Sequence, residues 1–322
     1  MSHIPRIDTH HHIIPPQIAG SGAGMKGMKV PSWSVEVDKV FNKECNIASA
    51  IYSVSTPGVL HISDPQESAK VAREMNEYCA RLRDEDPSGA SGFFATVPSL
   101  EHTDLVLEEL RYAFDVLKAD GVTLFTSYAT PEGYLGHPEY VPIWEELNRR
   151  KTIAFVHPAN NAAPVYVYFD ERLPMPAFDW PHETGRTAMD LILNRRLQQF
   201  PNVKIILSHG GGTLAALVRR ATIIELPEFG GVMSADDIMS QAKQFYFDTA
   251  LAGGPEMFPL IYNFAKPGHL LFGSDFPHAT VGVSKGFTKF VDEYEMDEEK
   301  KREIYYGAAL KLFPRLVGKV KI

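Results

Sequence analysis

The sequence has 322 residues, of which 44% are hydrophobic and 22% charged, and its formal net charge at pH 7 is -8. This is the composition of an ordinary globular protein, which excludes disordered and fibrous classes and leaves room for one large domain. The acidic balance, without a long run of Lys or Arg, argues against a nucleic-acid partner.

Short apolar runs rich in β-branched residues alternate with amphipathic helical stretches along the chain. This alternation is typical of a parallel sheet built from βα units. In chain order, the predicted strands are Ile4–Thr9, Ala48–Ser53, Gly92–Val97, Gly121–Thr126, Ile153–His157, Val203–Ser208, Phe245–Asp248 and His269–Phe272. Eight parallel strands close a barrel, so we predict an α/β fold, a single (β/α)8 TIM barrel domain that spans residues 1–322.

The segments between the strands carry helix and loop signals. Asp64, followed by Pro65 and Glu67, predicts a capped helix over residues 65–84. Two irregular stretches, Ile13–Ser34 and Pro158–Pro181, follow the first and fifth predicted strands. A barrel places its active-site loops at the carboxyl ends of its strands, so we expect these two stretches to be elaborated loops at the site.

No part of the sequence predicts a membrane segment. The first residues lack the charged and apolar regions of a signal sequence, and no window approaches the roughly 20 apolar residues that span a bilayer. The two cysteines, Cys45 and Cys79, have no CxxC spacing and are expected to be reduced. We therefore expect a cytoplasmic protein without a membrane partner.

Two histidines beside the first predicted strand are the strongest local signal of a functional site. Alternate residues of a strand face the same way, so His10 and His12 are expected to point together into the barrel. Two imidazoles on one face supply half of a metal site. The alternative, a histidine-rich or tag-like terminus, fits less well with the apolar residues on both sides. His11 is expected to face the other way and to be structural.

Three further ionisable residues end other predicted strands. His157 ends the fifth strand, His209 follows the sixth, and Asp275 follows the eighth. Any one of them could be an ordinary hydrogen-bonding residue, but a barrel brings the carboxyl ends of all its strands to one mouth. We therefore predict that His10, His12, His157 and Asp275 bind a divalent metal ion there.

Imidazole and carboxylate ligands suit Zn²⁺ best, with Mn²⁺ as a second choice. A second metal ion would need a bridging group, and the fourth strand offers no lysine for this role, so we expect one ion. His209 opens the turn His209–Thr213, and an imidazole kept neutral beside a cation can take a proton and return it. The glycines of this turn either let the chain approach substrate or only form a tight turn.

Four motifs in this order point to one protein family: DTHHH at 8–12, FVHP at 155–158, SHGGG at 208–212 and GSDFPHA at 273–279. The chain resembles the amidohydrolase-superfamily decarboxylases related to aminocarboxymuconate semialdehyde decarboxylase over nearly its full length. Among them it looks most like the fungal 6-methylsalicylate decarboxylases. The resemblance implies a carboxy-lyase on a TIM barrel with one divalent metal ion per subunit.

The resemblance also implies roles for single residues. In that family the residues that match His10, His12, His157 and Asp275 bind the metal, and the one that matches His209 is catalytic. Asp275 is in addition a candidate direct proton donor. Arg220 matches an arginine that holds a substrate carboxylate in a neighbouring subunit, although Arg219 is adjacent and both could be surface residues. On this basis we expect a homodimer or homotetramer.

One departure from the family pattern bears on the substrate. The aminocarboxymuconate enzymes carry an arginine ahead of a tryptophan in the first loop, whereas this chain has 25-MKGMK-29 before Trp33. A small aromatic substrate with one carboxylate, of the 6-methylsalicylate type, is therefore favoured. Two alternatives remain: metal-dependent hydrolysis of a lactone or amide, and a non-catalytic metal-binding protein.

Overall fold

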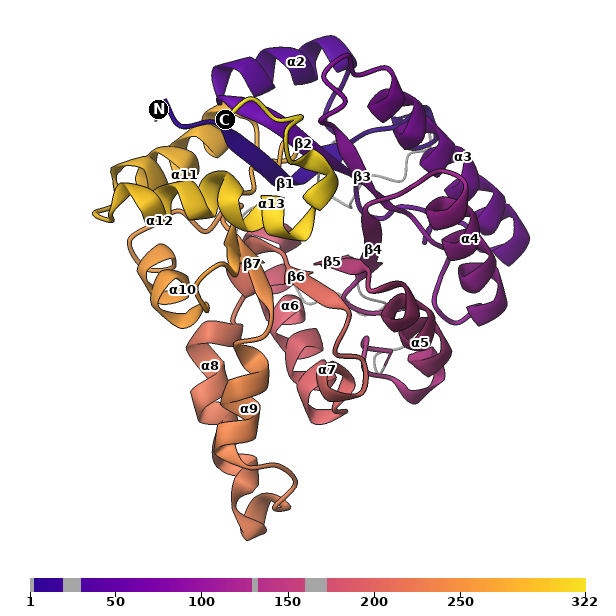
Figure 1. Ribbon diagram of the computed structural model, residues 1–322. Coiled ribbons are helices and arrows are strands. Elements are labelled where there is room, and N and C mark those ends of the chain that lie inside the picture. The colour runs from indigo at the N-terminus through magenta and orange to yellow at the C-terminus, as the bar shows by residue number, and fades with distance from the viewer. Residues whose placement is uncertain (1–2, 20–29, 129–132, 160–172) are drawn as a thin grey trace.

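A computed structural model describes residues 3–19, 30–128, 133–159 and 173–322. Its centre is a parallel sheet of eight strands in sequential order (Figure 1). The strands are β1 (Arg6–Ile13), β2 (Ile47–Val54), β3 (Gly92–Ala95), β4 (Gly121–Phe125), β5 (Ile153–His157), β6 (Lys204–Leu207), β7 (Tyr246–Asp248) and β8 (Leu270–Leu271). The predicted (β/α)8 barrel is confirmed.

The two ends of the sheet meet along β1. The Thr9 N–H donates to the carbonyl of Phe272 over 3.0 Å, and the His12 N–H donates to that of Phe276 over 2.7 Å. The segment after β8 therefore continues the barrel wall although β8 itself is short. Since backbone groups in a protein interior need partners, this pairing lets β1 lie buried along its whole length.

The prediction for the first strand, Ile4–Thr9, is wrong at both ends. Strand β1 begins at Arg6 and runs on to Ile13, which pairs with Val54 of β2. Histidine has no particular preference for strands, so sequence propensity gave no reason to extend the strand past Thr9. Pairing on both sides of β1 overrides that local preference. The other predicted strands agree with the structure within a few residues at each end.

Helices surround the barrel. They are α1 (Pro16–Ala19), α2 (Val35–Glu44), α3 (Pro65–Asp84), α4 (Thr103–Asp115), α5 (Val141–Arg150), α6 (Met175–Leu193), α7 (Arg196–Gln199), α8 (Leu214–Ala221), α9 (Ala235–Ala242), α10 (Phe258–Phe264), α11 (Val281–Glu293), α12 (Glu298–Arg302) and α13 (Ala308–Leu312). The predicted cap of α3 is confirmed, because the Asp64 carboxylate accepts the Glu67 N–H over 2.8 Å.

The two stretches predicted to be irregular contain helical parts. In Ile13–Ser34, residues Pro16–Ala19 form α1, and in Pro158–Pro181, residues from Met175 onward form the start of α6. Pro176 suits the first turn of a helix, where an N–H has no partner. Residues 20–29 and 160–172 of these stretches, which include the 25-MKGMK-29 segment, lie outside the described residues.

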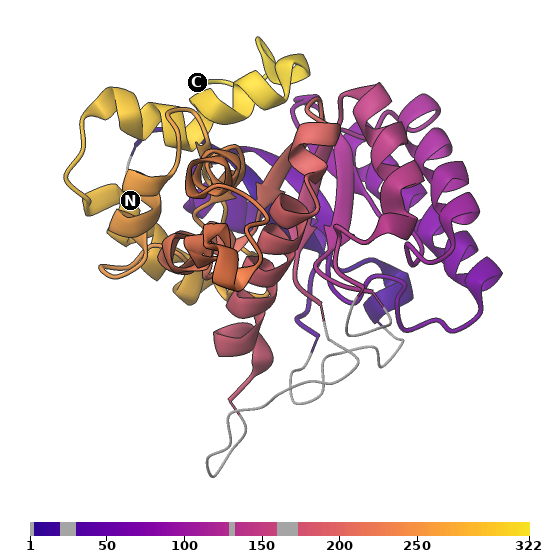
Figure 2. The same cartoon turned by 90° about the horizontal axis from the view of Figure 1, so that it is seen from below.

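The barrel interior is filled with apolar side chains at its amino-terminal end. Phe94 and Phe155 stack with ring centroids 5.2 Å apart. Phe313, just after α13, packs against Phe94 with ring centroids 6.0 Å apart. Figure 2 shows α13 and the end of the chain across this side of the barrel. Because this end is packed shut, the open mouth of the barrel lies at the carboxyl ends of the strands.

Helices α8 and α9 project beyond the ring of helices as a pair (Figure 1). We call residues 214–242 the α8–α9 arm. Several large apolar side chains of this arm are about half exposed: Leu217, Ile223, Leu226, Phe229 and Val232. In the part of the chain that the structure describes, no helix is both long and apolar enough to cross a membrane.

Candidate metal centre

His10 and His12 point into the mouth of the barrel from β1, as alternate residues of a strand must. Their Nε2 atoms lie 3.1 Å apart. Two nitrogens that bind one Zn²⁺ at about 2.0–2.1 Å in a tetrahedron lie about 3.3 Å from each other. The spacing of the two rings is therefore that of two ligands of a single ion.

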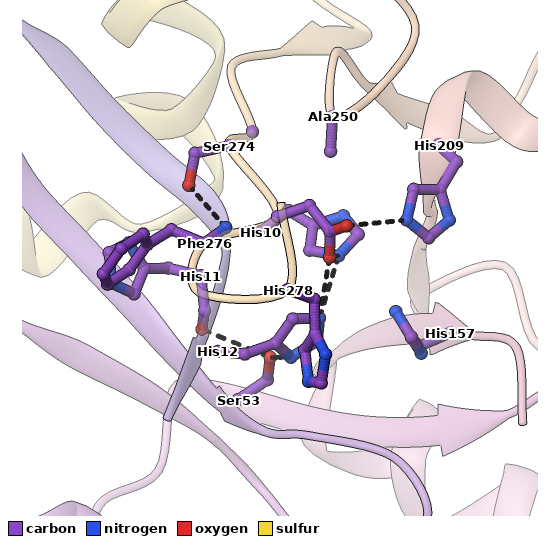
Figure 3. Close-up of polar contacts among 12 residues, drawn as sticks. His10, His11, His12, Ser53, His157, His209, Ala250, Ser274, Phe276 and His278 are labelled. Atoms are coloured by element: carbon purple, nitrogen blue, oxygen red, sulfur yellow. Dashed lines mark hydrogen bonds and ion pairs between the residues drawn. The ribbon is translucent and has the colours of Figure 1, made fainter. Parts of the chain in front are cut away.

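His157 and Asp275 complete a group of four. Figure 3 shows the three histidines of this group. One ligand atom from each of His10, His12, His157 and Asp275 lies within 4.8 Å of the others. Asp275 Oδ1 is 3.2 Å from His10 Nε2 and 3.3 Å from His12 Nε2. All four residues are buried. The structure thus brings together the four predicted metal ligands. We call these four residues the metal group.

Each of the three imidazoles is held through its other nitrogen. His10 Nδ1 donates to Asp248 Oδ2 over 2.8 Å, and His157 Nδ1 donates to the Pro158 carbonyl over 2.8 Å. His12 Nδ1 lies 2.9 Å from Ser53 Oγ. The Ser53 hydroxyl donates its hydrogen bond to the His11 carbonyl, so Ser53 Oγ can accept one from His12 Nδ1. Nδ1 is hydrogen-bonded in all three rings, so each Nε2 faces the centre and, once it carries no proton, presents the lone pair that metal binding requires.

Asp275 reaches the centre from a left-handed backbone conformation with φ +58°. Its N–H donates to the His10 carbonyl over 2.9 Å, which holds the turn against β1. The preceding Gly273 leaves no room for a side chain, because a Cβ there would lie 2.8 Å from the Cβ of His10. The GSD sequence after β8 is therefore what allows the carboxylate to come this close.

His209 lies beside the four ligands and is only partly buried. Its ring centroid is 4.8 Å from that of His10, and its Nε2 is 3.8 Å from Asp275 Oδ2. The His209 N–H donates to Asp248 Oδ1 over 2.9 Å, so Asp248 fixes both His10 and the start of the glycine turn. The structure thus places the His209 ring beside Asp275, at the edge of the four residues.

The glycines after His209 form a tight turn packed against protein. All three have positive φ, and a Cβ on Gly212 would lie 2.1 Å from the Pro181 carbonyl oxygen. A Cβ on Gly211 would lie 2.7 Å from the Phe247 ring. Of the two interpretations of this motif, the tight turn is the one that the described contacts support.

Charge within the group favours a cation at its centre. Burial alone would lower the pKa of His10, but the charges and hydrogen bonds of Asp248 and Asp275 raise it to about 10. Burial lowers the pKa of His12 to about 3, so this imidazole is neutral at pH 7. Burial would raise the pKa of Asp275, but hydrogen bonds from His10, His12 and His209 hold it well below its usual range. A carboxylate that stays charged in a buried site needs positive charge nearby.

His11 faces away from the metal group, as predicted. Its Nδ1 lies 2.9 Å from Asp8 Oδ2 and its Nε2 lies 2.6 Å from Asp38 Oδ1. Asp38 also accepts hydrogen bonds from Trp33 and Tyr52. Burial works against a charged imidazole here, but the two carboxylates raise the pKa of His11 to about 10. This residue therefore ties β1 to α2 and is structural.

A cavity of about 220 Å³ opens onto the metal group. Its polar lining consists of Thr56, His157, His209, Asp275 and His278, together with the Trp180 indole. The rest of the lining is apolar: Pro174, Pro176, Ala177, Leu251, Ala279 and Val283. No lysine or arginine lines the cavity within the described residues. The cavity therefore suits a flat apolar ring whose negative charge lies at the metal group.

Comparison with known proteins places this arrangement in a family. The model of the amidohydrolase family matches residues 7–315. The chain is 44% identical to the 6-methylsalicylic acid decarboxylase of Penicillium expansum over 97% of both chains. It belongs to the amidohydrolase family.

Other relatives agree with this assignment. The 6-methylsalicylic acid decarboxylase of Aspergillus aculeatus is also 44% identical, over 97% of this chain and 96% of that one. Among solved structures, the dihydroxybenzoic acid decarboxylase of a Polaromonas species, with bound manganese and 2-nitroresorcinol, superposes with a TM-score of 0.80. It is 19% identical and covers 96% of this chain and 97% of that one. The resemblance to amidohydrolase-type decarboxylases that the motifs predicted is confirmed.

The one predicted site residue that the structure does not bring to the metal group is Arg220. It lies exposed on α8, and it does not line the cavity of its own subunit. Arg219 beside it is also exposed. Helix α8 runs from the glycine turn out along the α8–α9 arm (Figure 1), and both arginines lie in its last turn.

Sequence reasoning missed three residues of the site: Asp248, Ser53 and His278. Asp248 is an ionisable residue at the end of a predicted strand, as His157 is, so the same sequence signal could have identified it. Ser53 and His278 had weaker signals, because a serine in a strand is common and His278 was quoted only as part of the GSDFPHA motif. Their roles depend on partners far along the chain, Asp248 with His10 and Ser53 with His12.

Proposed function

We propose that this protein is a metal-dependent decarboxylase of 6-methylsalicylic acid or a close hydroxybenzoate. The observation that carries the proposal is the 44% identity to 6-methylsalicylic acid decarboxylases over nearly the whole of both chains. The cavity supports it, since it is apolar and has no basic side chain among the described residues to hold a second carboxylate.

We propose one metal ion per subunit on His10, His12, His157 and Asp275. Three Nε2 atoms and a charged carboxylate suit Zn²⁺ best and Mn²⁺ as the second choice. The Polaromonas decarboxylase carries manganese. When bound, such an ion would polarise the oxygens of the substrate and draw electron density toward them. With Cys45 and Cys79 both unpaired, we also propose a cytoplasmic location.

In the proposed reaction, His209 and Asp275 move one proton. The ring carbon that bears the carboxylate is protonated, the bond from this carbon to the carboxylate breaks, and its electron pair restores the aromatic ring as CO₂ leaves. Asp275 Oδ2 is the oxygen nearest His209, whereas Oδ1 faces His10 and His12. His209, which is partly exposed, would take a proton from water and pass it to Asp275 or to the ring.

The test is CO₂ release by protein of known metal content from a panel of salicylates, muconates and lactones. We expect 6-methylsalicylate to give equal amounts of CO₂ and 3-methylphenol. Removal of the metal by a chelator is expected to lower the rate by at least about 100-fold, with recovery on adding Zn²⁺ or Mn²⁺. Hydrolysis of lactones without CO₂ from any acid would contradict the proposal and favour a hydrolase.

We further infer a homo-oligomer, a dimer or tetramer, formed through the α8–α9 arm. Half-exposed side chains such as Phe229 and Val232 form an apolar surface that is costly to leave in water. A groove of about 530 Å³ beside the arm, between α6 and α8, is lined by apolar Leu193, Leu217 and Val218. Arg220, in the last turn of α8 in the same arm, would enter the cavity of a neighbouring subunit and contact the substrate carboxylate.

Mixed oligomers test this role of Arg220. Alone, Arg220→Ala and His209→Ala subunits are expected to have little activity. In a symmetric dimer, a mixed pair has one site with both an intact His209 and an intact Arg220, so coexpression should restore activity at about a quarter of the sites. The Arg219→Ala variant is the matched control and should need no complementation. Absence of recovery, in mixtures shown by mass to contain both chains, would exclude a shared site.

A further inference from the structure

The end of β2 carries hydroxyl groups that face the mouth of the barrel. Ser53 and Ser55 are alternate residues of this segment, so their side chains lie on the same face. Ser53 Oγ contacts the metal-group residue His12, and Ser55 Oγ hydrogen-bonds Nε2 of His278. His278 is thus held by Ser55, which lies just past the end of β2 and two residues after the serine that contacts the predicted metal ligand His12.

The backbone around His278 is fixed by hydrogen bonds. The turn after β8 is closed by the Ala279 N–H, which donates to the Asp275 carbonyl over 2.8 Å, and it is held to β1 through the carbonyl of Phe276. Phe276 itself stacks on Phe41 with ring centroids 4.0 Å apart. Because both its backbone and Nε2 are held, the His278 ring has little freedom to turn.

The second ring nitrogen of His278 is free to bind a ligand. Within the described residues no hydrogen-bond partner contacts Nδ1, and this atom is not among the buried polar atoms that lack a partner. His278 lines the cavity, and its ring lies beside that of His12, with centroids 5.4 Å apart (Figure 3). Nδ1 is therefore a polar atom open to the cavity and rigidly positioned.

His278 and His209 lie on different edges of the metal group. The ring contacts of His209 are with His10 and His157, whereas His278 contacts His12. The proton-handling pair, His209 and Asp275, must face the ring carbon that bears the carboxylate. A substituent next to that carbon can then reach the His278 edge, where the nearby Thr56 hydroxyl also lacks a partner.

We propose that His278 is a substrate-binding residue that recognises the hydroxyl group ortho to the carboxylate, with Ser55 as its positioning residue. This inference rests on the proposed function. An imidazole nitrogen accepts a hydrogen bond from a phenol or, in its other tautomer, donates one to a phenolate, so the contact serves either form of the substrate. The rest of the lining is mostly apolar, and so His278 would distinguish a hydroxybenzoate from an alkylbenzoate.

The test measures what the hydroxyl group contributes to binding, with and without His278. Binding of 6-methylsalicylate and of 2-methylbenzoate, which lacks the hydroxyl, is measured by calorimetry on metal-loaded protein in a His209→Asn background that prevents turnover. With His278 present, we expect the hydroxyl to tighten binding by about 10- to 100-fold. In His278→Leu this preference should fall below about 3-fold, and in His278→Asn, which keeps a polar group, it should be partly restored.

Three controls make the result decisive. The exposed His61→Leu variant should keep the full preference, Ser55→Ala should lower it to an intermediate value, and metal content should not change in any variant. An unchanged preference in His278→Leu would overturn the inference, and so would an equal loss of affinity for both ligands, which would indicate a structural role. Failure of the unsubstituted protein to release CO₂ would instead refute the proposed function, and the binding comparison would remain interpretable.

Discussion

A His209→Asn variant is expected to bind metal normally and to lose about a thousandfold in kcat. Acid–base groups in the transition state contribute about 10²- to 10⁴-fold, and His209 is the only partly exposed imidazole that contacts Asp275 within the described residues. A thousandfold corresponds to about 4 kcal/mol of barrier. The measurement is steady-state CO₂ release together with metal analysis of the same sample.

The size of the loss in kcat shows whether His209 handles the proton or only lies beside the site. Asparagine is small enough for the turn and keeps a polar group, so the fold and the Asp248 contact to the residue 209 backbone should remain. His61, which is exposed and outside the cavity, offers a matched control as His61→Asn, which should retain full activity. If His209→Asn kept more than about a tenth of kcat, His209 would not handle the proton, and Asp275 would have to exchange it with water directly.

An Asp248→Ala variant is expected to lower metal affinity by about 10- to 100-fold and to destabilise the fold. Groups that hold a metal-binding histidine typically contribute this much. The carboxylate of Asp248 accepts hydrogen bonds from three donors: His10 Nδ1 and the backbone N–H groups of His209 and Ala250. Among the described residues these donors have no other hydrogen-bond partner. Each donor left unpaired in the interior costs about 1–3 kcal/mol.

Metal dependence distinguishes this variant from His209→Asn. Activity of Asp248→Ala should rise as metal is added, because the ligands themselves are intact, whereas His209→Asn should stay slow at any metal concentration. The exposed Asp104→Asn on α4, away from the α8–α9 arm, serves as control for a lost surface charge. Equal metal affinity in Asp248→Ala and the unsubstituted protein, measured by competition with a chelator, would show that His10 is oriented by its other neighbours alone.

Most of the barrel was predictable because each βα unit carries its own local signal. Strands β4 and β5 are continuous apolar runs, and α3 has a capping aspartate and a proline at its first position. Where the prediction was wrong, distant contacts had decided the structure. The extension of β1 to Ile13 depends on pairing with residues 52–54 of β2 and with residues 272–276, which lie more than 250 positions away, and no local pattern contains these contacts.

The four predicted metal ligands could be expected to lie together because a barrel brings its strand ends to one mouth whatever the loops do. The residues that hydrogen-bond these side chains could not be predicted from the sequence. Ser53 and Asp248 become recognisable only when the structure places them beside His12 and His10. Arg220 is the opposite case. Its sequence position suggested a site residue, but the structure of one subunit places it on an exposed arm.

The closure of the barrel along β1 has a consequence for how the protein is made. The Ser274 N–H bonds Asp8, 266 residues earlier in the chain, and the ligands His10 and Asp275 meet across the same seam. A growing chain on the ribosome therefore holds only part of the metal group until residue 275 has emerged and the last strand has joined the first. An ion bound by the proposed ligands would therefore be captured only after the last strand has joined the first, and it would hold the two ends of the barrel together.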